Sequence, residues 1–309
     1  MQNETVKPKS LFPFKSNDKK RLATFWVGVT ILIILFSTFV ASWPSTASDM
    51  YNNINNLKPE TIKDLINKGV FPSISGGLLQ VRFTFTYITN ILAGVSLITY
   101  AAMPKHLWTK RMLFLSNVYI SITFIVFWSV IIPFVFTTPH FWSFLKANAA
   151  WIALTIPVHF LNPLIAIIMF IINRKNLVVS HRTMLYSFLM MISYWLFALL
   201  LFVSGIRVAE LFLNQATPEQ QSNITGIDSI YLQTQVIIYP FLNFSHPMGY
   251  AGDNVAIKTI INILIPISGS LLCIGLAYFW KGVCHIKIYN KKDLLKPEFK
   301  SNNKPLFDK

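Results

Sequence analysis

The chain contains 309 residues, of which 53% are hydrophobic and only 13% are charged, and its mean hydropathy is +0.51. Because about a quarter of the residues in an ordinary soluble domain are charged, this composition excludes a typical water-soluble protein. The net charge is +15, but the Lys and Arg residues cluster beside apolar segments, which argues for a role in membrane topology and against nucleic-acid binding.

Six apolar segments follow one another along the chain. Each is long enough for an α-helix to cross the hydrocarbon core of a membrane, which takes about 20 residues. They span residues 22–43, 78–103, 113–137, 149–172, 185–206 and 259–280. We therefore predict an all-α fold, a polytopic membrane protein whose single membrane domain, residues 22–280, is a bundle of six transmembrane helices.

The distribution of basic residues predicts the orientation of this bundle. Lys and Arg are concentrated in residues 1–21, in the loops after the second and fourth segments, and in residues 281–309. Such clusters mark the cytoplasmic side, so both termini are expected in the cytoplasm and the protein in the cell membrane. Within these basic tails, residues 1–20 and 288–309 are predicted to be disordered and solvated, with a secondary attraction to anionic lipids.

Two loops on the opposite side are expected to carry structure of their own. Residues 58–69 begin with a proline suited to a first helical turn and place three apolar residues on one face, which predicts a short amphipathic helix. Residues 217–220, TPEQ, match a capping box. The apolar residues 236–244 are too few to span a membrane and are expected to form a re-entrant or interfacial lid.

Polar side chains recur at helical spacing within two of the apolar segments. In the fourth segment Thr155, His159 and Asn162 form one stripe, and an imidazole in a membrane needs a hydrogen-bond partner or a task. In the second segment a similar line contains Arg82, Thr86, Asn90 and Gly94. At roughly 1.5 Å of rise per residue, Thr86 and His159 differ in depth by only a few Å. The two side chains are therefore expected to meet within the bundle.

A threonine hydroxyl becomes a nucleophile when a base takes its proton, and a neutral histidine beside it can supply that base. The six segments contain no Asp or Glu. A carboxylate that orients His159 would therefore have to come from a loop, where the candidates are Glu210, Asp228 and Asp253. The alternative is that these polar side chains only cross-link helices, as intramembrane Thr, Asn and His commonly do.

Three motifs occur along the chain: FTYITN at residues 85–90, HFLNP at residues 159–163 and YPFL at residues 239–242. The three motifs follow one another in the same order as in the androgen-induced and androgen-dependent integral membrane hydrolases and their bacterial relatives. The chain resembles these proteins over residues 22–280. It also resembles an uncharacterised six-span membrane protein family of mollicutes. The animal members of the first family are threonine hydrolases that cleave fatty-acid esters of hydroxy fatty acids. The resemblance implies Thr86 as the nucleophile and His159 as the base.

The sequence also departs from the family pattern. Thr89 and Asn90 stand where the animal enzymes differ, and Pro163 follows His159 by four residues rather than five. Thr84 and Thr89 therefore remain rival nucleophiles beside Thr86.

The leading hypothesis is a membrane-embedded hydrolase of lipid esters, with membrane lipids and an acyl-ester lipid substrate as partners and with no metal or organic cofactor. Its catalytic residues would be Thr86 and His159, and its substrate-binding residues would be Arg82, Asn90, Asn162, Tyr239 and Arg207. The alternatives are a non-enzymatic lipid- or small-solute-binding membrane protein or transporter, and a scaffold whose basic tails bind partners.

Overall fold

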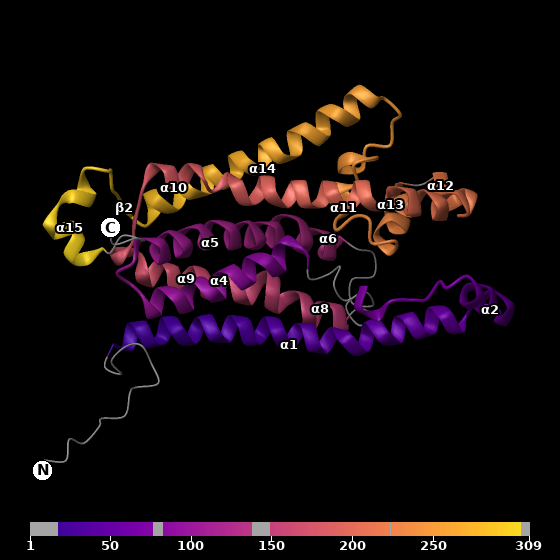
Figure 1. Ribbon diagram of the computed structural model, residues 1–309, viewed down its shortest axis with the longest axis horizontal. Helices are drawn as coiled ribbons and strands as arrows, with labels where there is room; N and C mark the ends of the chain where they lie inside the picture. The colour runs from indigo at the N-terminus through magenta and orange to yellow at the C-terminus, as the bar shows by residue number, and fades with distance from the viewer. Residues whose placement is uncertain (1–17, 77–82, 138–148, 223, 304–309) are drawn as a thin grey trace, which may run out of the picture.

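The computed structural model describes residues 18–76, 83–137, 149–222 and 224–303 of the chain. Within them the structure is an elongated bundle of helices that run side by side (Figure 1). We call the end of the bundle that holds the start of α1 (Lys19–Asn55) and α15 (Pro297–Asn302) the terminal end. The opposite end, which holds α2 (Pro59–Asn67), is called the loop end.

Six helices among the described residues are long and apolar enough to cross a membrane, and they cover Lys19–Asn55, Phe85–Ala102, Leu107–Ser129, Ile152–Asn176, His181–Asn214 and Val255–Val283. They are built from α1, α4 (Phe85–Ala102), α5 (Leu107–Val126), η1 (Phe127–Ile131), α8 (Ala149–Ile156), η2 (Pro157–Leu161), α9 (Asn162–Asn173), η3 (Arg174–Asn176), α10 (His181–Leu185), α11 (Phe188–Asn214) and α14 (Val255–Val283). Here η1 and η2 are π-helical, and η3 is a 3₁₀ turn. The prediction of six long apolar helices is confirmed.

The remaining elements are short. They are α2, α6 (Ile132–Thr137), α12 (Pro218–Ser222), α13 (Ile224–Gln233), α15, the 3₁₀ turns η4 (Pro240–Leu242), η5 (Pro247–Gly249) and η6 (Asp293–Leu295), and the strands β1 (Val178–Val179) and β2 (Lys287–Ile288). The two strands pair in parallel, Val178 with Lys287 and Val179 with Ile288. This small pair at the terminal end is the one departure from an all-α fold in the described part of the chain.

Several helix boundaries differ from the predicted ones. Helix α1 continues to Asn55, well past residue 43, and its hydroxyl side chains there bond to the helix backbone. Ser42 donates to the Phe39 carbonyl at 2.8 Å, and Thr46 donates to the Ser42 carbonyl at 2.9 Å. The third helix begins at Leu107 rather than at residue 113. Residues 78–82 of the second predicted segment lie outside the described residues.

The centre of the bundle is formed by α4 and α5, and α11 and α14 form its outer face. In α4 and in the span that starts at Leu107, 61% of the most apolar stretch is buried, against 17% in the spans that contain α11 and α14. The outer helices expose large apolar side chains such as Leu200 and Leu271. An apolar exterior around a satisfied helical backbone is the arrangement that a lipid environment requires.

Helices α1 and α4 approach each other closely at two glycines. A Cβ atom added at Gly94 would lie 2.7 Å from Cδ2 of Leu32 and 3.0 Å from the Gly28 carbonyl oxygen. Small residues at such a crossing let two backbones come together, which is a common packing device between membrane helices. This contact packs α4 directly against α1.

The structured loops agree in part with their predictions. The amphipathic helix is present as α2, and Gly69, with φ +69°, follows it. The capping box is also confirmed, since the Thr217 N–H donates to Gln220 Oε1 at 3.1 Å and the Gln220 N–H donates to Thr217 Oγ1 at 3.4 Å. The apolar segment 236–244 packs Ile238 and Leu242 into the main core.

The prediction of a disordered C-terminal tail is wrong for residues 288–303. Strand β2, η6 and α15 fold this stretch back onto the terminal end of the bundle. Arg111 Nε donates to the Tyr289 hydroxyl at 3.0 Å, and the Tyr289 ring packs 5.3 Å from that of Phe299. These contacts give a polar segment enough partners to order it.

We expect Gly94→Leu to lower the free energy of unfolding by about 1–3 kcal/mol, because the new side chain must displace Leu32 or separate α1 from α4. The measurement is the unfolding midpoint in detergent. Gly275→Leu on α14 is the matched control, since no atom lies within 4 Å of a Cβ placed there. An equal loss of stability in both variants would contradict the close contact.

Candidate functional site

The side chains of Thr86 and His159 meet, as expected from the sequence. Thr86 is the second residue of α4, and His159 lies in η2, the π-helical segment between α8 and α9. Thr86 Oγ1 is 3.1 Å from His159 Nε2, which is hydrogen-bond distance. The Thr86 side chain is buried. Two residues that are far apart in the chain therefore form a hydrogen-bonded pair inside the bundle.

The second nitrogen of the imidazole determines the direction of this hydrogen bond. His159 Nδ1 is 3.0 Å from the Thr155 carbonyl oxygen. A carbonyl can only accept, so Nδ1 carries the proton and donates, and Nε2 of the neutral ring is the acceptor. Thr86 must then donate its hydroxyl proton to Nε2. This is the arrangement that a general base requires of its nucleophile.

The backbone around His159 is π-helical and begins at a proline. Pro157 has no N–H group and cannot make a regular helical hydrogen bond, and the Asn162 N–H donates to the Pro157 carbonyl five residues earlier. Such π-segments often occur at functional sites, where they rotate side chains out of the ordinary helical register. A second π-segment, η1, contributes Phe127, whose ring stacks on His159 with centroids 6.4 Å apart.

Tyr239 brings a third chain segment to the site. The Phe85 N–H, one of the N–H groups that a helix leaves unpaired at its start, donates to the Tyr239 hydroxyl at 3.1 Å. Burial raises the pKa of Tyr239, while its contacts with the backbone N–H groups of Phe85 and Thr86 oppose that rise. The group is therefore a neutral phenol, and its own proton is left to donate.

The two asparagines predicted to bind substrate serve as cross-links. Asn90 Nδ2 donates to the carbonyls of Thr86 at 2.8 Å and of Val158 at 2.9 Å. Asn162 Nδ2 donates to the Ile31 carbonyl on α1 at 3.2 Å. Both side chains are completely buried. Asn90 thus joins the backbone beside the nucleophile to the backbone beside the base.

The geometry separates Thr86 from its two rivals. Thr89 is completely buried. Its hydroxyl donates to the Thr86 carbonyl at 3.1 Å and pairs with Thr123 on α5 at 2.9 Å. Thr84 is the N-cap residue of α4, and its side chain interacts with the Tyr239 hydroxyl. Of the three hydroxyl groups, the Thr86 hydroxyl is the one paired with His159.

The group that the structure places against Nδ1 of His159 is a backbone carbonyl, and not one of the three candidate loop carboxylates. Asp228 instead accepts a hydrogen bond from Asn243 at 2.7 Å, and Glu210 and Asp253 are exposed at the surface. The Thr155 carbonyl holds the imidazole. A carbonyl one turn away lies on the same helix as the ring, so it can orient the ring without burying a charge.

The two arginines predicted to bind substrate are not part of the described site. Arg82 lies outside the described residues, and Arg207 is exposed on α11. Within the described residues, no group of three or more His, Cys, Asp or Glu side chains is placed to hold a metal ion. The chemistry available to the site is therefore that of a hydroxyl, an imidazole, a phenol and a helix N-terminus.

Sequence reasoning missed two contributors to the site. Phe127 stacks on the imidazole, and Tyr194 donates to the Phe83 carbonyl at 3.1 Å and packs edge-on against Phe85. Neither residue lies in a polar stripe or in a recognisable motif. Aromatic residues are frequent throughout the apolar segments, so no local signal separated these two from the others.

We expect Asn90→Leu to lower the free energy of unfolding by about 1–3 kcal/mol, because two buried carbonyls lose their side-chain donor. The measurement is thermal unfolding of the purified protein. Asn53→Leu, at an exposed position of α1, is the matched control. If Asn90 served only to contact substrate, the stability of the two variants would not differ.

None of the protein-family models, curated proteins or solved structures compared with the chain matches it. The residues that can act chemically are therefore identified from their own geometry. They are the Thr86–His159 pair, the Tyr239 phenol and the N-terminus of α4.

Proposed function

We propose that this chain is an integral membrane hydrolase of lipid esters, with Thr86 as the nucleophile and His159 as the general base. The observation that carries the proposal is the 3.1 Å contact between Thr86 Oγ1 and His159 Nε2. The direction of this hydrogen bond depends on Nδ1, which stays protonated because it donates to the Thr155 carbonyl. The imidazole is thereby held in the tautomer that can accept the threonine proton.

In the first step Thr86 Oγ1 attacks the carbonyl carbon of the ester, and its proton moves to His159 Nε2. The tetrahedral intermediate carries a negative charge on the former carbonyl oxygen. When it collapses, the bond to the leaving alkoxide breaks and His159 returns the proton to that oxygen. The products of this half-reaction are a free alcohol and an acyl ester on Thr86.

In the second step water replaces the alcohol. His159 Nε2 accepts a proton from the water as its oxygen attacks the acyl carbon, and then gives that proton to Thr86 Oγ1 as the acyl bond breaks. The fatty acid leaves and the dyad returns to its starting state. The two steps together need no external oxidant, reductant or metal ion.

The start of α4 and Tyr239 can stabilise the oxyanion. Thr86 lies in the first turn of an 18-residue helix, where the backbone N–H groups and the helix dipole favour negative charge. The Tyr239 hydroxyl accepts from the Phe85 N–H, so it can donate its own proton to an oxygen bound at Thr86. Donors already aimed at the developing charge are often the largest single contribution to acyl-transfer catalysis.

Two further features support a lipid ester as the substrate. The site lies within a bundle whose six long helices are apolar enough to span a membrane, so the substrate with easiest access is itself a lipid. In addition, the three motifs that resemble the integral membrane threonine hydrolases converge on one place. Residues 85–90 contact residues 159–163 through Thr86, and they contact residues 239–242 through Phe85.

The orientation is proposed from the charge pattern. Lys and Arg are concentrated at the terminal end, so that end is assigned to the cytoplasm and the loop end to the outside. The nucleophile at the start of α4 is then in the outer half of a plasma membrane, where residues 239–242 cover it. Arg207, exposed on α11, is a candidate for contact with the headgroup of a bound lipid.

A fluorophosphonate probe tests the nucleophile. We expect the purified wild-type protein to be labelled at Thr86, Thr86→Ala and His159→Ala to lose the label, and Thr86→Ser to retain it because a serine hydroxyl occupies the same place. Thr99→Ala is the matched control, since that α4 hydroxyl only bonds to its own helix backbone and to Met112. An unlabelled, folded wild-type protein would favour the binding or transport alternative.

The oxyanion role of Tyr239 is tested with a medium-chain p-nitrophenyl ester. We expect Tyr239→Phe to lower kcat by about 10²–10³-fold with little change in KM, because the donor acts on charge that develops in the transition state. Tyr250→Phe, in the same loop, is the control. If Tyr239→Phe raised KM alone, the phenol would bind substrate and not the transition state.

A further inference from the structure

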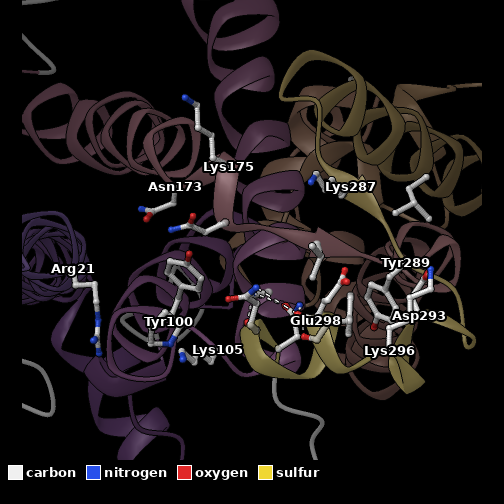
Figure 2. A pocket seen from close by; sticks show the side chains of 18 of the residues that line it. Arg21, Tyr100, Lys105, Asn173, Lys175, Lys287, Tyr289, Asp293, Lys296 and Glu298 are labelled. Atoms are coloured by element: carbon white, nitrogen blue, oxygen red, sulfur yellow. Dashed lines mark hydrogen bonds and ion pairs between the residues drawn. The ribbon is translucent and has the colours of Figure 1, made fainter.

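A cavity of about 840 Å³ lies at the terminal end of the bundle, away from the Thr86–His159 pair. Seven basic and three acidic side chains line it. They come from five parts of the chain: the start of α1, the α4–α5 connection, the first turn of α5, η3, and the C-terminal segment. Figure 2 shows Lys105, Lys175 and Lys287 around it, with Tyr100 and Asn173 between them.

The three carboxylates of the cavity offset only part of this charge. Asp18 pairs with Arg21 at 3.8 Å, and Asp293 pairs with Lys296 at 2.7 Å. Arg21 also donates to the Ala101 carbonyl at the end of α4. Among the described residues, Lys20, Lys105, Lys110, Lys175 and Lys287 form no ion pair with a carboxylate.

Two buried groups on the cavity wall point to a missing partner. Lys110 is only 5% exposed, yet its acceptors are the neutral oxygens of Asn303, at 2.7 Å, and Asn302, at 3.4 Å. A buried ammonium group without a counter-ion is costly. The Tyr100 hydroxyl is also buried and meets no group at hydrogen-bond geometry, although the Asn176 side chain is near enough to interact with it.

We infer that this cavity is a binding site for a phosphate-bearing anion. A phosphate group carries more than one negative charge and several acceptor oxygens, so a single ligand can satisfy lysines from different helices together with the Tyr100 hydroxyl. The volume exceeds that of one phosphate and leaves room for a larger molecule. Basic pockets between membrane helices bind the headgroups of anionic lipids, and soluble phosphate compounds present the same chemistry.

The fold of the C-terminal segment supports this assignment. Residues 287–303 supply Lys287 and one wall of the cavity, and the segment is tied to the bundle by the Tyr289–Arg111 and Asn303–Lys110 contacts. A bound anion would link this segment to α1 through Lys20 and to η3 through Lys175. The site is thus assembled from segments that approach each other only in the folded chain.

The experiment uses the full chain in nanodiscs of phosphatidylcholine and measures its thermal unfolding midpoint. One arm adds inorganic pyrophosphate to represent a soluble ligand, and the other adds phosphatidic acid to the bilayer to represent a lipid headgroup. We expect at least one arm to raise the midpoint. A shift with pyrophosphate alone assigns a soluble ligand, a shift with phosphatidic acid alone assigns a lipid, and a shift in both arms assigns a site for the shared phosphate group.

The variant Lys20→Gln/Lys175→Gln/Lys287→Gln should bind the active probe at least about tenfold more weakly, since hydrogen bonds to charged groups are lost. The control Lys291→Gln/Lys292→Gln/Lys300→Gln removes the same charge from exposed positions outside the cavity. If neither probe shifts the wild type, or if the control loses as much affinity as the cavity variant, the inference is overturned. If the triple variant does not fold, the single variants Lys175→Gln and Lys287→Gln replace it, and each should also bind the active probe more weakly than the wild type.

Discussion

The structure depends on one kind of interaction: hydrogen bonds from buried polar side chains that join one helix of an apolar bundle to the next. Asn90 joins α4 to η2, Asn162 joins η2 and α9 to α1, and the Thr89–Thr123 contact joins α4 to α5. Trp280 on α14 donates to Ser121 on α5 at 2.9 Å. Each contact satisfies a group that would be costly to bury alone, and together they set the register of the helices.

The Thr86–His159 pair is a product of this network. Its two members lie on different helices, and their 3.1 Å separation is maintained because Asn90 holds the carbonyls of both Thr86 and Val158. His159 lies in the π-segment and faces Thr86 on α4, and the Phe127 ring stacks on its own ring. A reactive geometry is thus supported by contacts that do no chemistry themselves, as precise active sites generally require.

The bundle has two chemically different ends. The site at the start of α4 contains neutral donors and acceptors, whereas the cavity at the terminal end is lined by an excess of lysine and arginine. Thr86 belongs to the site and Tyr100 to the cavity, and both residues lie on α4. They are about 21 Å apart along the helix axis at 1.5 Å of rise per residue. Helices α1, α4 and α9 extend between both places, so a ligand that tightened the terminal end would act on helices that also position the dyad.

Much of the architecture could be read from the sequence because membrane-length helices are a local property. A run of about 20 apolar residues has few alternatives to a helix in lipid, so the six helices, the amphipathic α2 and the capping box were all predictable. The pairing of Thr86 with His159 was also within reach, because polar stripes at helical spacing indicate which side chains face inward.

Other features were decided only by the tertiary structure. The carbonyl that orients His159, the stacking of Phe127, the contact of Tyr239 with the start of α4 and the folded C-terminal segment involve backbone atoms, common aromatic residues and polar loops. None of these carries a periodic signal. The sequence by itself therefore determined which segments are helices and which polar faces turn inward, because hydrophobicity and spacing act along the chain. The tertiary structure decided which groups meet, because those contacts depend on how separate helices pack.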